Sequence, residues 1–214
     1  LASVFGLLLC VVTGLFGTRN AYGNFNMTFF WIVFVLGFAY LTALAGNAYA
    51  VINPWRVLAD GINRVFSTYT RGLITYPKCL KSWTALLLYM AFIWIELFGG
   101  TTPHSLALIL LGYTALNLVG VGLVGARSWF THCEFFSLFF HLIGAMAPLV
   151  YRPYDSTQGE SRLVLRWPFT GLLSARAGSI SVLLFILFML SSTAFDGLHE
   201  TQIWRRIFWV DLYH

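Results

Sequence analysis

The sequence predicts an all-α fold: a polytopic bundle of five to six transmembrane helices, with amphipathic helices at the membrane interface. Two observations predict this class. Of the 214 residues, 58% are hydrophobic and only 10% are charged, whereas a soluble domain carries about a quarter charged residues. The apolar residues also gather in long runs separated by short polar connections. Together these observations exclude a water-soluble globule, a disordered chain and a disulfide scaffold.

The net charge of +5 arises from 13 Lys and Arg residues against 8 Asp and Glu residues. In so apolar a chain, this excess suits membrane topology and contacts with anionic headgroups. No nucleic-acid-binding motif is present, so the expected partners are the lipid bilayer and other membrane protein subunits. Cys10, Cys79 and Cys133 are odd in number and lack a CxxC spacing, so they indicate neither a disulfide framework nor a zinc site.

Six apolar segments are the expected spans: residues 1–16, 27–45, 82–98, 103–124, 129–150 and 179–197. The first is shorter than the about 20 residues that cross a bilayer. Residues 203–214 resemble the beginning of another membrane-facing segment. We therefore expect residues 1–214 to form a single transmembrane domain that is part of a longer chain.

Residues 129–150 either cross the membrane or form a re-entrant or interfacial segment, because this apolar run contains one acid and two histidines. The basic connection 46–81 is expected in the cytoplasm by the positive-inside rule. If 129–150 crosses, the four arginines of the connection 152–176 lie outside, against that rule. If it does not cross, they lie inside. The sequence leaves both topologies open.

Two connections carry structure of their own. Asn53, Pro54, Trp55 and Arg56 open a stretch, residues 54–66, in which apolar and polar positions alternate with helical periodicity. This pattern predicts an amphipathic helix that begins at the proline and lies at the cytoplasmic interface. Residues 152–178 are polar and contain two prolines, which favours an exposed loop with a short helix or turn.

Three acids lie within apolar runs and are the candidate catalytic residues: Glu96, Glu134 and Asp196. An ionisable side chain at membrane depth is unfavourable by at least about 2.5–3.5 kcal/mol unless it is paired or hydrated. A simpler interpretation is that Glu96 and Asp196 lie near span ends and reach headgroup water. If 129–150 does not cross, these two acids approach the same leaflet and can meet there in a shared site; if it crosses, they lie on opposite sides of the membrane.

The candidate metal ligands are these three acids with two histidines: Glu96, Glu134, His141, Asp196 and His199. Glu134 and His141 are seven residues apart and share a helix face, as do Asp196, His199 and Glu200. Carboxylates and imidazoles on facing helices suit a divalent metal or a proton relay. The sequence contains no HExxH, GxSxG or GxxxxGK[ST] motif and no convincing haem-ligand pair. The cofactor therefore stays open between a divalent metal and none.

Several short motifs resemble those of a known family. They are residues 53–56 (NPWR), 192–197 (STAFDG), Thr201 with Trp204, and Trp94 with Glu96. With the stretch 125–148, the chain resembles a mostly uncharacterised family of polytopic prokaryotic membrane proteins, some of which are labelled fenitrothion hydrolase. This chain carries Cys133 where the family has glycine. The resemblance implies a prokaryotic inner-membrane location and, through the label, organophosphate ester hydrolysis. It provides no established catalytic residues.

Three functions follow as alternatives. The first is an integral membrane subunit or scaffold that packs into a larger assembly, because nucleophile, cofactor and phosphate motifs are lacking. The second is a membrane-embedded hydrolase in which a divalent metal lowers the pKa of its bound water to about 7. The third is a proton-coupled transporter that uses the same acids as a relay, although the sequence shows no inverted repeat.

Overall fold

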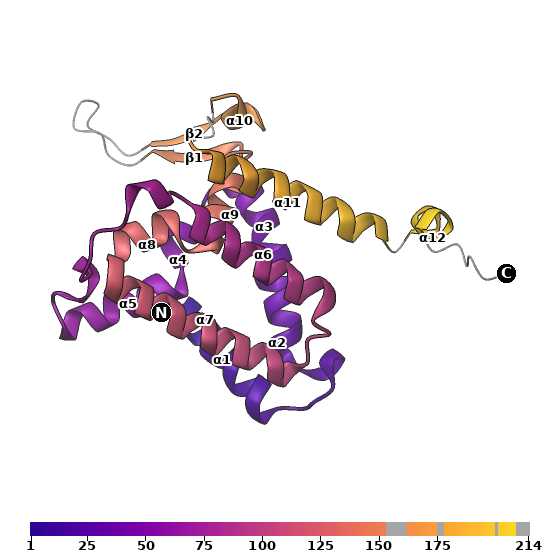
Figure 1. Cartoon of the computed structure of the whole chain (residues 1–214), viewed down its shortest axis with the longest axis horizontal. Helices are drawn as coiled ribbons and strands as arrows, with labels where there is room; N and C mark the ends of the chain where they lie inside the picture. The colour runs from indigo at the N-terminus through magenta and orange to yellow at the C-terminus, as the bar shows by residue number, and fades with distance from the viewer. Residues whose placement is uncertain (153–161, 175–177, 200, 209–214) are drawn as a thin grey trace.

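The computed structural model describes residues 1–152, 162–174, 178–199 and 201–208, and it is mostly helical. In chain order the elements are α1 (Ala2–Phe16), η1 (Ala21–Gly23), α2 (Phe25–Met27), η2 (Thr28–Gly37), α3 (Phe38–Ala45), α4 (Tyr49–Ile52), α5 (Pro54–Val65), η3 (Tyr69–Arg71), η4 (Lys78–Leu80), α6 (Trp83–Phe98), α7 (Pro103–Val124), α8 (Ala126–His132), α9 (Phe135–Gly144), β1 (Leu149–Arg152), β2 (Arg162–Leu165), α10 (Thr170–Ser174), α11 (Ile180–His199) and α12 (Gln202–Phe208). Figure 1 shows α1 to α9 gathered in one body, from which α11 and α12 extend to one side.

Three helical stretches are long and apolar enough to span a membrane: Phe25–Ala45, Pro103–Val124 and Ile180–His199. The first joins α2, α3 and the wider π-helix η2 into one continuous rod. The helices α1 and α6 match the expected segments but have only 15 and 16 residues. At 1.5 Å per residue each measures about 23 Å, less than the about 30 Å of a hydrocarbon core. The expected count of five to six spans therefore exceeds the three helices of spanning length.

The expected segment 129–150 is not one helix. It divides into α8 and α9, which are separated at Cys133 and Glu134. The ten residues of α9 measure about 15 Å, half of the hydrocarbon thickness. Residues 129–150 therefore do not form one continuous helix of spanning length.

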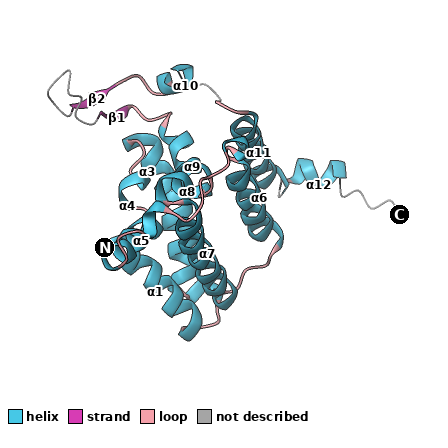
Figure 2. Ribbon diagram, turned by 60° about the vertical axis from the view of Figure 1, so that its left-hand side comes forward, coloured by secondary structure: helices cyan, strands magenta, loops and turns pink. Residues whose placement is uncertain are grey.

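The helices α6 and α11 lie side by side and run in the same direction, as Figure 2 shows. In their first turns the backbone N–H of Ser82 donates to Ser181 Oγ at 3.1 Å. Near their last turns Glu96 and Asp196 line one cavity. Because α7 returns the chain to the end where α6 begins, the chain between α7 and α11 starts and finishes at that same end. This arrangement agrees with the non-crossing alternative.

The predicted amphipathic helix is α5, but most of its first turn is buried. Asn53 is 2% exposed and Trp55 is 1% exposed, and Pro54 is also buried, whereas Arg56 is exposed. Of the four residues expected at the interface, only Arg56 is exposed. The indole of Trp55 stacks on Phe136 with ring centroids 5.8 Å apart, so burial within the protein is favoured over a membrane surface.

The expected loop 152–178, of which residues 153–161 and 175–177 lie outside the described residues, begins with an antiparallel strand pair. Leu149 of β1 pairs with Leu165 of β2, and Arg152 pairs with Arg162. Beyond β2, the guanidinium of Arg166 donates to the carbonyl oxygens of residues 145 and 147 at 2.7 and 2.8 Å. These bonds satisfy carbonyls that follow the end of α9. The sequence did not predict the strands, because each has only four residues.

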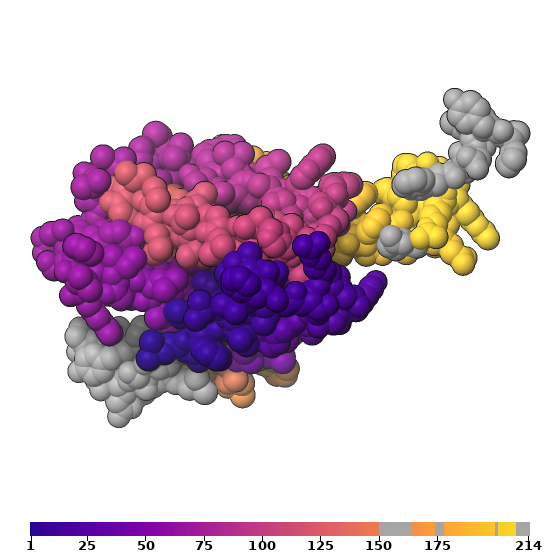
Figure 3. All heavy atoms as spheres, turned by 90° about the horizontal axis from the view of Figure 1, so that it is seen from below, coloured from indigo at the N-terminus to yellow at the C-terminus, as the bar shows by residue number. Residues whose placement is uncertain are grey.

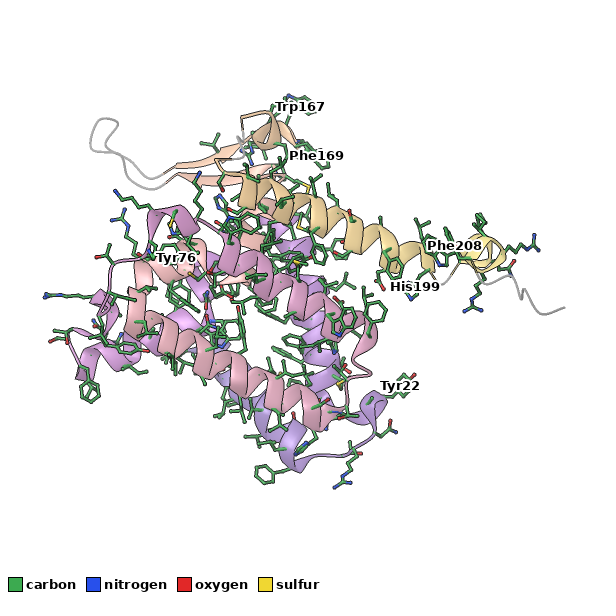
Figure 4. All side chains as sticks on the ribbon, in the orientation of Figure 1. Tyr22, Tyr76, Trp167, Phe169, His199 and Phe208 are labelled. Carbon is green, nitrogen blue, oxygen red and sulfur yellow. The ribbon has the colours of Figure 1, made fainter. Side chains whose placement is uncertain are left out.

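The connection between α5 and α6 is attached to α8 by an aromatic contact. The ring of Tyr76 stacks on His132 with centroids 5.5 Å apart, and Figure 4 shows Tyr76 beside α8 at the edge of the body. Burial raises the pKa of Tyr76 to about 12. Its hydroxyl donates to the carbonyl oxygen of Lys81 at 2.8 Å.

The packing of α8 against α7 depends on a small residue. A Cβ atom at Gly120 would lie 2.4 Å from the ring of Trp129. That ring is fixed, because Trp129 is 9% exposed and its Nε1 donates to Asn117 Oδ1 at 2.8 Å. Gly120 therefore provides the space that seats α8 on α7, in line with the role expected of small residues between membrane helices.

We expect Gly120→Ala to destabilise the protein by about 2 kcal/mol, because the added methyl group overpacks a rigid contact. The thermal midpoint in mild detergent should fall by about 4–8 °C. Gly112→Ala is the matched control, since it lies on the same helix and a Cβ there meets nothing within 4 Å. Equal midpoints for the two variants would contradict the assigned role of Gly120.

Candidate functional site

A buried polar cluster lies where α5, α7 and α9 meet, and Glu134 is its centre. The residue is 1% exposed and caps α9: its carboxylate accepts hydrogen bonds from the backbone N–H groups of Phe136 and Ser137 at 3.2 and 2.7 Å. The hydroxyl of Tyr113 donates to Oε1 at 2.6 Å, and Asn53 Nδ2 donates to Oε2 at 3.4 Å. Four donors therefore surround one carboxylate.

Asn53 connects this carboxylate to the beginning of α5. Its Oδ1 accepts from the backbone N–H groups of Trp55 and Arg56 at 2.9 and 3.1 Å, which is the bonding of a helix N-cap. Its Nδ2 donates to Glu134 and also to Ser137 Oγ at 3.3 Å. The N-termini of α5 and α9 thus meet through the two side chains that cap them.

This meeting point lies halfway along α7. Tyr113 belongs to the middle of the helix Pro103–Val124, and so does Thr114, whose Oγ1 accepts from Trp55 Nε1 at 3.0 Å. Non-helical backbone at membrane depth is tolerated only where it is buried in protein or lines a cavity. Here each cap accepts hydrogen bonds from two backbone N–H groups at the beginning of its helix, which stabilises the break in the chain at this point.

The surroundings of Glu134 favour a structural role. Within the described chain, its hydrogen-bond donors are neutral, and the positive ends of two helices add favourable electrostatics. Charge-assisted bonds of this kind are about twice as strong as neutral ones. The carboxylate is nearly inaccessible, so the geometry assigns Glu134 to joining α5, α7 and α9 rather than to the cavity that contains the other two acids.

Glu96 and Asp196 lie together at a different place. Both line a cavity of about 350 Å³ between η2, α3, α6, α9 and α11. They are exposed side chains and are close enough to repel each other electrostatically. Aromatic and aliphatic side chains form most of the wall, and Ser192 and Thr193 supply further polar groups. The two acids that the sequence singled out together thus line the same cavity.

The two candidate histidines do not join these acids. His141 is exposed and lines a separate cavity beside α5 and α8. His199 stacks on Phe195 of its own helix with centroids 5.2 Å apart, and Figure 4 shows it at the outer end of α11. Glu200 lies outside the described residues. In the part of the chain that the structure describes, no three His, Cys, Asp or Glu side chains group closely enough to hold a metal ion.

Sequence reasoning missed Tyr113 and Ser137 as partners of Glu134. One signal was available: asparagine directly before a proline marks a helix beginning, and it locates the cap at Asn53. No comparable signal marks Tyr113, because a single tyrosine within an apolar helix gives no indication of its partner.

Comparisons with known proteins found no matching family model, no matching curated protein and no matching solved structure.

Proposed function

We propose that this chain is a helical subunit of a membrane assembly, and that a partner helix bearing a Lys or Arg side chain binds at the cavity of Glu96 and Asp196. In the proposed topology the connection 46–81 faces the cytoplasm of a prokaryotic cell. The apolar helices cross or enter the inner membrane. The observation that carries this proposal is a pair of neighbouring carboxylates at the rim of an apolar cavity.

The unpaired state of these acids supports a cationic partner. Neither carboxylate forms a hydrogen bond or ion pair with another residue in the described ranges. Two carboxylates that repel each other are unfavourable near a membrane, where acids pair with cations or face water. A single ammonium or guanidinium group between them would pair with both.

The position of α11 leaves room for a partner. Among its neighbours in the body, α11 packs chiefly against α6, and Figure 3 shows the C-terminal elements standing out from the rest of the molecule. Leu183, Leu187 and Leu190 on α11 are 45%, 51% and 59% exposed. This apolar flank adjoins the acidic rim, so one helix could cover both.

The two alternative functions receive less support from the geometry. The metal-dependent hydrolase needs the five candidate ligands to converge, whereas the described residues bring only Glu96 and Asp196 together. The proton-coupled transporter would use the same two acids, and it differs from a subunit in needing no cationic partner.

A photo-crosslinking experiment tests the subunit proposal. Benzoylphenylalanine is placed at Thr193, an exposed residue of the cavity wall, and the protein is expressed in its own host membrane. We expect irradiation to join this position to a second polypeptide. Peptide sequencing of the adduct should find an apolar segment that contains Lys or Arg. The same probe at Leu108, which is 51% exposed on α7, is the positional control.

Removing the charges of Glu96 and Asp196 tests whether these carboxylates bind the partner. In the double variant Glu96→Gln with Asp196→Asn, the crosslink from Thr193 should fall at least about tenfold, because the charge-assisted pairs are lost. An unchanged crosslink, an adduct without a basic residue, or adducts with lipid alone would each overturn the proposal. An adduct with a second copy of this chain would overturn it too, unless the captured segment carries a basic residue.

A further inference from the structure

A second cavity lies on the other side of the buried cluster and has the opposite charge. It measures about 230 Å³ and is walled by α4, α5, α8 and α9, which gather beside the C-terminal half of α7 in Figure 1. Its charged and polar lining residues are Asn47, Asn53, Arg56, Arg127, Thr131, Ser137 and His141. The described lining contains no Asp or Glu.

The two arginines are held near the cavity and are free to bind. The guanidinium of Arg56 lies over the ring of Phe130, 5.9 Å from its centroid, which restricts its position. Arg127 lies in the first turn of α8. Both side chains are exposed, and neither bonds to a carboxylate in the described ranges. The nearest acid along α5, Asp60, is exposed and does not line the cavity.

The buried side of the cavity is polar, although the side-chain amide of Asn53 already donates to Glu134 and to Ser137 Oγ. Asn53 and Ser137 form part of the wall, and Glu134 behind them is already bonded by four donors. Tyr49 is another wall residue; it is 1% exposed, and its hydroxyl has no hydrogen-bond partner among the described atoms. A buried hydroxyl without a partner is unfavourable by about 1–3 kcal/mol. An oxygen-rich anion would therefore meet two arginines here, beside a wall in which the hydroxyl of Tyr49 has no partner among the described atoms.

We infer that this cavity binds a phosphate group, either that of a lipid headgroup or free phosphate. Guanidinium groups match the geometry of phosphate oxygens and bind them in pairs. The cavity is smaller than the about 300–1,000 Å³ of typical organic-ligand sites, which suits a phosphate rather than a bulky ligand. It also lies near the end of α7 that adjoins the basic connection, where lipid headgroups are expected in the proposed topology.

Binding assays on the whole protein test this inference. In detergent, inorganic phosphate is titrated by calorimetry. In nanodiscs of phosphatidylcholine, retention of added phosphatidic acid is measured by native mass spectrometry. We expect Arg56→Gln and Arg127→Gln each to weaken binding of at least one phosphate probe about tenfold. Arg64→Gln is the matched control, because it removes the same charge from an exposed position of α5 outside the cavity.

The results distinguish a lipid headgroup from free phosphate as the ligand of the cavity. Retention of phosphatidic acid that 10-fold excess inorganic phosphate does not displace would identify a lipid headgroup as the ligand, whereas direct binding of inorganic phosphate would identify the free ion. The inference fails if neither probe binds, or if Arg64→Gln weakens binding as much as Arg56→Gln. It fails also if oleic acid, an anion without phosphate, is retained equally well. Unchanged circular dichroism of the exposed-arginine variants would separate lost binding from lost folding.

Discussion

Glu134→Ala should destabilise the protein by about 3 kcal/mol or more, because it removes one acceptor that serves four buried donors. The backbone N–H groups of Phe136 and Ser137 lose their cap, and Tyr113 and Asn53 lose a partner. Each unsatisfied buried group is unfavourable by about 1–3 kcal/mol. The thermal midpoint measured in mild detergent should fall by about 6–12 °C, with a reduced yield of monodisperse protein.

Two further variants test whether the loss of stability is specific to the capping carboxylate of Glu134. Glu134→Gln keeps the shape and one carbonyl acceptor, so it should lose about half as much stability as the alanine variant. Glu96→Ala removes an exposed carboxylate and should leave the midpoint within about 1–2 °C, since exposed substitutions stay within about 0.5 kcal/mol. If Glu134→Ala and Glu96→Ala had equal midpoints, the capping role of Glu134 would be wrong.

The apolar helices were predictable because their signal is local. Residues 82–98, 103–124 and 179–197 lie within a few residues of α6, α7 and α11, since length and hydropathy are read from neighbouring residues alone. The helix α5 was predictable for the same reason, through its proline and its amphipathic spacing. Its burial was not predictable, because the contact of Trp55 with Thr114 joins residues 59 positions apart.

The break between α8 and α9 shows where hydropathy fails. Residues 129–150 have the composition of a span, yet Glu134 ends one helix and caps the next. The carboxylate is more stable with two free N–H groups and two side-chain donors than it would be within an uninterrupted apolar helix. The break between α8 and α9 therefore depends on Tyr113 and Asn53, which lie 21 and 81 residues away from Glu134 in the sequence.

The topology gave a reason to expect Glu96 and Asp196 near the same end of the molecule, and both line one cavity there. Each acid lies near the end of its apolar segment, so two parallel helices bring both acids to the same end of the molecule. The separation of His141 and His199 from these acids could not be foreseen in the same way. Helix spacing shows which residues share a face of one helix, but it does not show which neighbour that face contacts.

Trp55→Ala is expected to be the most destabilising single substitution in the first turn of α5, by about 3–5 kcal/mol. The side chain is 1% exposed, and its ring lies parallel to that of Phe136 and perpendicular to that of Tyr113. Its removal would leave a large cavity at the point where α5 and α9 meet α7. The thermal midpoint in mild detergent should fall by about 6–20 °C.

A double-mutant cycle separates the packing of Trp55 from its hydrogen bond. Trp55→Phe keeps most of the ring but loses the bond from Nε1 to Thr114 Oγ1, and Thr114→Val removes the acceptor. Each single variant should lose about 1 kcal/mol for that bond, and the double variant should lose less than the sum of the two. Strictly additive losses would show that Trp55 is held by packing alone.

A near-normal midpoint for Trp55→Ala would show that α5 does not enter the bundle at this position, and the meeting of the two helix caps would then be wrong as well.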